Sequence, residues 1–86
     1  MEVTFSPSFL GSLRTLQQQL QNEVFEKIDL FSDIKNHKIL KVHKLKGRLR
    51  GCYSFSVNYH IRIVFEFVGK PRRAYLLAIG DHEVYN

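Results

Sequence analysis

The segment YSFSVNYHIRIVFEF, residues 53–67, decides the fold of this chain. In its first half Tyr53, Phe55 and Val57 alternate with polar residues. In its second half the alternating apolar residues are Ile61, Ile63, Phe65 and Phe67. A period of two is the pattern of a half-buried β-strand. The segment therefore predicts two strands of a meander.

The sequence after this segment predicts one more strand. Gly69-Lys70-Pro71 has the composition of a turn, and residues 74–79 form a continuous apolar run. A short run of this kind suits a central strand buried on both faces. Gly80 ends it.

The sequence before the segment predicts a strand followed by helix. Residues 3–5 favour a strand, Ser6 can cap a helix, and Pro7 suits its first turn. Apolar residues then recur every three or four positions, at Phe9, Leu10, Leu13, Leu16, Leu20, Val24, Ile28 and Phe31. This spacing predicts helix to about Ile34, with an apolar face. We expect a helical hairpin, because one helix of that length would exceed the diameter of so small a domain.

Together these elements predict an α+β fold. With 86 residues the chain can form a single domain, residues 1–86, because two cores would each bury too little apolar surface. We expect two N-terminal helices packed on one face of a mainly antiparallel four-stranded sheet, in the order β-α-α-β-β-β. The other face remains available for function.

The composition of the chain indicates in which cellular compartment it works. The single cysteine, Cys52, excludes an intramolecular disulfide, and no Cys/His pattern indicates a zinc site. No apolar run reaches the roughly 20 residues that span a bilayer, and the N-terminus lacks the features of a signal peptide. We therefore expect a cytoplasmic protein with no membrane association.

The net charge of +5 is concentrated in one segment. Between Lys35 and Arg50 there are seven Lys or Arg residues, two His and no acid. Such a segment attracts RNA, DNA or an acidic protein. The alternative is an ordinary solvated basic loop.

Four short motifs occur in a fixed order in the second half of the chain. They are an H-x-L-x-G loop at residues 43–47, a G-x-aromatic-S strand start at 51–54, an R-I-x-F strand at 62–65, and a terminal I-G-x-H-x-x-Y at 79–85. Because these four motifs occur in this order, the chain resembles the RelE/ParE superfamily of toxins from type II toxin–antitoxin systems. The terminal histidine and tyrosine make it most similar to the RelE, YoeB and YafQ messenger-RNA interferases.

The resemblance implies an endoribonuclease that cleaves messenger RNA, free or on the ribosome. In this family the ribose 2′-hydroxyl attacks the adjacent phosphate without a metal ion, so no cofactor is expected. The implied partners are a cognate antitoxin, messenger RNA, the ribosome and, through the antitoxin only, operator DNA. Without the antitoxin a homodimer is a further expectation.

The resemblance implies catalytic roles for Arg62, His82 and Tyr85. His82 matches the family's catalytic histidine, and imidazole can transfer protons near neutral pH. Arg62 would clamp the scissile phosphate, and Tyr85 would orient the nucleotide. The structural alternatives are a surface histidine, an arginine paired with Glu66, and a terminal ring packed on the sheet.

The resemblance also indicates residues that bind RNA. His43 matches a histidine of the YafQ-like branch, and its basic neighbours would bind flanking phosphates. These neighbours are Lys41, Lys44, Lys46 and Arg48. The chain has Ser56 and His60 where the YafQ-like branch has its second histidine and an aspartate. The general base is therefore open, and His60 is a candidate.

Two other functions remain open from the sequence. One is a ParE-like toxin that inhibits gyrase or another protein target without catalysis. The other is an inactive relative that binds the antitoxin.

Overall fold

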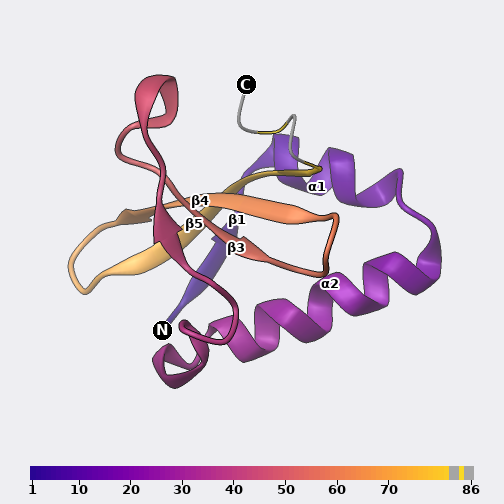
Figure 1. Cartoon of the computed structure of the whole chain (residues 1–86), viewed down its shortest axis with the longest axis horizontal. Coiled ribbons are helices and arrows are strands. Elements are labelled where there is room, and N and C mark those ends of the chain that lie inside the picture. Colours follow the sequence, from indigo (N-terminus) through magenta and orange to yellow (C-terminus); the bar gives the residue numbers. More distant parts are fainter. Residues whose placement is uncertain (82–83, 85–86) are drawn as a thin grey trace.

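The computed structural model describes residues 1–81 and Val84, which form two helices and a five-stranded sheet (Figure 1). The strands are β1 (Val3–Phe5), β2 (His43–Lys44), β3 (Tyr53–Ser56), β4 (Arg62–Val68) and β5 (Arg73–Gly80). The helices are α1 (Pro7–Arg14) and α2 (Gln18–Phe31), and two 3₁₀ turns lie at Ile34–Asn36 and Gly47–Leu49. The strand order is β1-β5-β4-β3-β2.

The α+β fold class and the antiparallel meander are confirmed. β4 pairs antiparallel with both β3 and β5, and only β1 pairs parallel, along β5. The number of strands was wrong. The described sheet has a fifth strand, β2, because His43 and Lys44 pair with Ser54 and Tyr53. A two-residue strand has no period that a sequence pattern can reveal.

The predicted break in the helical segment is confirmed, because α1 ends at Arg14 and α2 begins at Gln18. Residues 7–34 as one helix would be about 42 Å long, which exceeds the 34 Å longest extent of the molecule. The Gln21 side chain holds the connection, since its Nε2 donates to the Leu16 carbonyl at 2.8 Å. In Figure 1 the chain turns back between the two helices.

The start of α1 also agrees with the sequence. Ser6 Oγ caps the helix by accepting from the Phe9 N–H at 2.9 Å, and Pro7 is its first residue. The same hydroxyl donates to the Leu77 carbonyl at 3.1 Å. This cap therefore ties α1 to β5.

Both helices bury their apolar sides against the same face of the sheet. Phe9 and Leu13 of α1, and Val24, Ile28 and Phe31 of α2, join one core cluster with residues from β3, β4 and β5. Phe31 is at its centre. Its ring stacks on the rings of Phe55 and His37, with distances of 4.2 Å and 4.7 Å between ring centres.

The last strand is less buried than its apolar run predicts. β5 lies between β1 and β4, as expected of a central strand. Ala74 and Leu76 are buried, whereas Tyr75 and Leu77–Ile79 are only half-buried. The expectation of burial on both faces was wrong, because the core cluster fills one side only. In the part of the chain that the structure describes, no helix has the length and hydropathy to cross a membrane.

Candidate functional site

The sheet has one face that neither helix covers, and we call it the helix-free face. Side chains alternate across a strand, so Arg62, Val64 and Glu66 lie on this face, opposite the core residues Ile63 and Phe65. Pairing brings other residues beside them on the same side. These are Ser56 and Gly80 beside Arg62, and Ser54, His43 and Ala78 in the row of Val64.

Arg62 is the first residue of β4 and is half-buried. Its Nη1 donates to the carbonyls of Asn58 at 2.9 Å, Tyr59 at 3.2 Å and Ile61 at 3.4 Å. The guanidinium therefore holds the β3–β4 turn. These bonds use Nη1 alone, and an arginine has three further N–H donors on Nε and Nη2.

The structural alternative for Arg62, an ion pair with Glu66, is not formed. The ion pairs in the described residues join Lys27 to Glu26 and Arg73 to Glu2. Glu66 instead lies near Cys52. Burial raises the pKa of the Cys52 thiol, and the negative charge of Glu66 raises it further.

His82 and Tyr85 lie outside the described residues, so their predicted roles stay predictions. Around them the structure describes Gly80, Asp81 and Val84. The Val84 N–H donates to the Asp81 carbonyl at 3.0 Å. A β-carbon added at Gly80 would lie 3.4 Å from the β-carbon of Val84. Val84 therefore lies beside Gly80, the residue that pairs with Arg62.

His60 lies in the β3–β4 turn and is exposed. Its backbone N–H donates to Asn58 Oδ1 at 2.8 Å, and its ring meets Tyr59 edge-on at 5.4 Å. Within the part of the chain that the structure describes, the imidazole ring makes no hydrogen bond or ion pair. The turn therefore fixes the backbone of His60 and leaves its imidazole in solvent.

His43 lies on β2 and is also exposed, but its ring is oriented. Nδ1 lies 2.8 Å from the Lys41 carbonyl. A carbonyl only accepts, so Nδ1 carries the proton, and Nε2 of the neutral ring has the lone pair. Lys41 has a left-handed backbone with φ of 60°. The conformation of Lys41 therefore contributes to the orientation of His43.

The predicted RNA-binding lysines and arginine are all exposed but do not share one surface. Lys46 and Arg48 lie in the β2–β3 loop, which projects beyond the sheet in Figure 1. Lys44 pairs with Tyr53, whose ring packs against Phe65 of the core. Lys44 therefore lies on the side opposite His43 and Arg62.

Asn58 was missed by the sequence interpretation. Its Oδ1 accepts from the N–H groups of His60 at 2.8 Å and Ile61 at 2.9 Å. Its Nδ2 donates to Glu23 Oε1 at 2.6 Å, which links the turn to α2. An asparagine that accepts from its own backbone two residues on is a known turn signal. That signal could have identified the turn that Arg62 completes.

The described residues contain no group of three or more His, Cys, Asp or Glu side chains that could hold a metal ion. A pocket of about 340 Å³ is lined by none of the predicted catalytic residues. The predicted catalytic site is therefore the helix-free face around Arg62 and not this pocket.

No protein-family model matches the sequence, and no curated protein matches it. Solved structures do match its fold. The toxin–antitoxin complex RelBE2 of Mycobacterium tuberculosis matches with a TM-score of 0.75 and 17% identity, over 94% of this chain and 96% of that chain. The YoeB–YefM complex of Staphylococcus aureus matches with a TM-score of 0.72 and 23% identity, over 95% and 97%. YafQ of E. coli matches with a TM-score of 0.73 and 15% identity, over 96% and 94%.

Proposed function

The chain has the fold of the RelE/ParE toxin superfamily, and from this premise we propose that it is the toxin of a toxin–antitoxin pair and cleaves RNA. The observation that supports this most is the place of Arg62. It lies on the helix-free face and pairs with Gly80, and His82 follows Gly80 by two residues in the sequence. An arginine that can hold a phosphate, with a histidine two residues in sequence beyond its paired position, suits attack on a phosphodiester.

In the proposed reaction the ribose 2′-hydroxyl attacks the adjacent phosphate and the 5′-oxygen leaves. One group must take the proton of the nucleophile, and another must supply one to the leaving oxygen. We assign the second role to His82. Arg62 stabilises the charge that builds on the phosphate, through Nε and Nη2. Tyr85 stacks on a base beside the cut.

We expect cleavage to depend on the planar guanidinium of Arg62 and not only on its positive charge. Arg62→Lys keeps the charge but loses the planar set of donors, so we expect RNA cleavage to fall by about 100-fold or more. Thermal unfolding should shift as well, because the three turn carbonyls lose their donor. Single-turnover cleavage and calorimetry measure the two effects. If Arg62→Lys cleaved RNA at the full rate, the guanidinium of Arg62 would have no role in stabilising the transition state.

The general base is better assigned to His43 than to His60. His43 presents an oriented Nε2 on the same face as Arg62, about 12 Å away between α-carbons by strand geometry. A phosphate between two side chains of this length can reach both. The His60 ring has no such orientation.

We expect His43→Ala to lower cleavage by about 100-fold or more, as for loss of a general base. It should also remove the acidic limb of the pH–rate profile. His60→Ala should leave that limb in place. The profiles of both variants, measured on the same RNA, decide between the two histidines. Loss of the limb in His60→Ala alone would reverse the assignment.

The β2–β3 loop should bind phosphates outside the cut. Replacement of both Lys46 and Arg48 by alanine should weaken RNA binding. The slope of the logarithm of the binding constant against the logarithm of the salt concentration should become about 1.4 less steep, at about 0.7 per phosphate contact with a single strand. The rate at saturating RNA should not change. Arg14→Ala, which removes an exposed charge at the end of α1, is the control. An unchanged salt slope in the double variant would exclude the loop from RNA binding.

The proposed partners follow from the same premise. A cognate acidic antitoxin would cover the basic surface and bind operator DNA, and messenger RNA, free or on the ribosome, is the substrate. Cleavage assays with and without ribosomes test the activity. Growth arrest on induction, relieved by the product of the neighbouring gene, tests the toxin role. The same protein run on a sizing column tests the homodimer.

One observation favours a second function. Arg62 already donates to three carbonyls of its own turn, which a purely structural arginine would also do. A toxin of this fold that inhibits gyrase or another protein would need no phosphate clamp. Growth arrest without any RNA cleavage would support this alternative, and neither effect would support an inactive relative that binds the antitoxin.

A further inference from the structure

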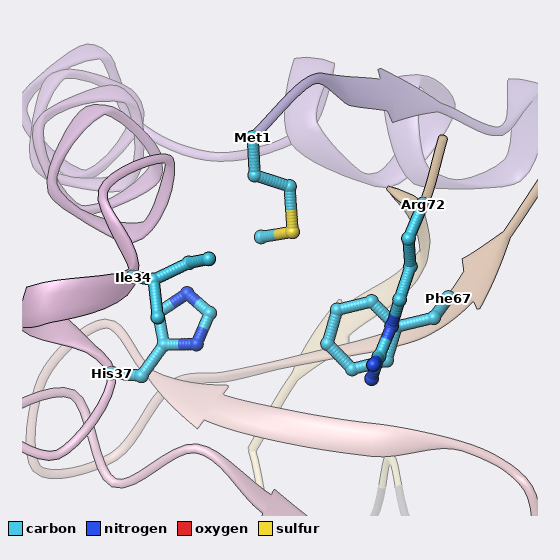
Figure 2. A pocket seen from close by; sticks show the side chains of 5 residues that line it. All are labelled: Met1, Ile34, His37, Phe67 and Arg72. Carbon is cyan, nitrogen blue, oxygen red and sulfur yellow. The ribbon is translucent and has the colours of Figure 1, made fainter. Parts of the chain in front are cut away.

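A pocket of about 340 Å³ opens beside Phe67, near the end of β4 (Figure 2). It is lined by Met1, Ile34, His37, Phe67 and Arg72. Phe67 follows Arg62 by five residues on β4, a separation of about 17 Å along a strand. Phe67 also packs against the core, on the side of the sheet that the helices cover. The pocket is therefore separate from the helix-free face.

The walls of the pocket are mostly apolar. Phe67 is fixed by edge-on contacts with Tyr53 at 4.9 Å and Phe65 at 5.2 Å. Figure 2 shows Ile34 and His37 on one side, Phe67 and Arg72 on the other, and the Met1 side chain between them. Such walls favour a large apolar group.

The two polar groups of the pocket are both held in place. The Arg72 guanidinium lies 3.6 Å above the centre of the Phe67 ring, a cation–π contact that leaves its N–H edges able to bind a carboxylate. The His37 ring stacks on Phe31, and its Nε2 donates to the Phe31 carbonyl at 2.9 Å. Because Nε2 is engaged in that bond, Nδ1 is the ring nitrogen that can contact a ligand.

The surroundings of the pocket are basic. Residues 1–2, 33–38 and 70–73 include four of the five lining residues and contain five Lys or Arg residues and two acids, Asp33 and Glu2, of which Glu2 pairs with Arg73. An anionic ligand would find complementary charge here, and a cationic one would not.

We propose that this pocket binds a large apolar side chain flanked by carboxylates, presented by an acidic segment of a partner protein. A protein segment suits the site better than a free small molecule, because small-molecule sites bury about 70–90% of their ligand. This pocket is open, since Ile34 is 68% exposed. Leu30, near the end of α2 and four residues before Ile34 in the chain, is also 40% exposed. A segment longer than the pocket can contact apolar residues outside it, whereas a small ligand cannot.

The pocket chemistry can be tested with 4-phenylbutyrate on the ¹⁵N-labelled full chain. We expect millimolar binding, with amide shifts at Ile34, His37, Phe67 and Arg72. The cationic analogue 4-phenylbutylamine should not bind there. Arg72→Gln should weaken phenylbutyrate binding about tenfold or more, as for loss of a hydrogen bond to a charged group. Arg14→Gln, which removes an exposed charge from α1, should leave it unchanged.

The partner is tested with two blocked pentapeptides, EEFLE and KKFLK. EEFLE should shift the same amides and bind at least about tenfold more tightly than phenylbutyrate, which corresponds to about 1.4 kcal/mol, and it should also shift Leu30. Equal affinity of EEFLE and phenylbutyrate would overturn the protein segment as occupant. Equal binding of both peptides, no binding of phenylbutyrate, or shifts spread along residues 41–50 would overturn the proposal. No RNA is involved, so these outcomes are independent of the proposed ribonuclease activity.

Discussion

Replacement of His82 by alanine is expected to lower RNA cleavage by about two to four orders of magnitude, the effect of losing a general acid or base. His82 follows the end of β5, where Gly80 pairs with Arg62. Imidazole titrates near neutral pH, so it can supply a proton to the leaving oxygen without a strongly altered environment. The rate of cleavage of a defined RNA, measured in a single turnover, gives the effect.

Two controls separate the chemistry of His82 from its other contributions. Thermal unfolding of His82→Ala should match that of the parent protein, so that the loss of rate is not a loss of fold. Addition of EDTA should leave the parent rate unchanged, because the proposed reaction uses side chains alone. If His82→Ala and Arg62→Ala both kept full cleavage and full toxicity, the assignment of a nuclease site here would be wrong, and the protein-binding toxin would replace it.

Replacement of Phe31 by alanine is expected to destabilise the protein by about 3–5 kcal/mol, the usual cost of truncating a buried phenylalanine. Phe31 is fully buried, and its ring contacts Phe55, His37 and Phe65 at 4.2, 4.7 and 4.8 Å. At roughly 4–8 °C per kcal/mol for a domain of this size, the melting temperature should fall by at least about 12 °C. Calorimetry measures this.

Phe25→Ala is the matched control, because Phe25 has the same side chain on the same helix but is 49% exposed. It should change stability by about 0.5 kcal/mol or less. If Phe31→Ala does not fold, Phe31→Leu keeps part of the volume and should fall between the two. Similar losses from Phe25→Ala and Phe31→Ala would contradict the core described above.

Local patterns in the sequence were enough to predict most elements and the face each buries. The alternation in residues 53–67 predicts β3 and β4, and the three-to-four spacing from Phe9 to Phe31 predicts both helices. Ser6 and Pro7 mark the start of α1. These predictions succeeded because helical and strand periods depend on residues close in the chain. The fold class followed from the order of the elements.

The candidate site could be predicted from the sequence only in part. Motif order identified Arg62 and His43, which the structure brings to one face. It also grouped Lys44 with them, although that side chain lies on the other side of the sheet. A basic cluster in a sequence does not specify on which face each residue lies, because one position along a strand reverses the side.

What the sequence by itself determined is therefore the order of elements, the single basic segment and the residue types available for phosphate chemistry. Only the tertiary structure decided that β1 pairs with β5, 71 residues away, and that β2 forms an edge strand. It also decided that Arg62 binds its own turn and that Ile34, His37, Phe67 and Arg72 form a pocket. The physical reason is the same for each. Such contacts join residues that are distant in sequence or depend on side-chain direction, and the gain from forming them appears only when the whole chain has packed.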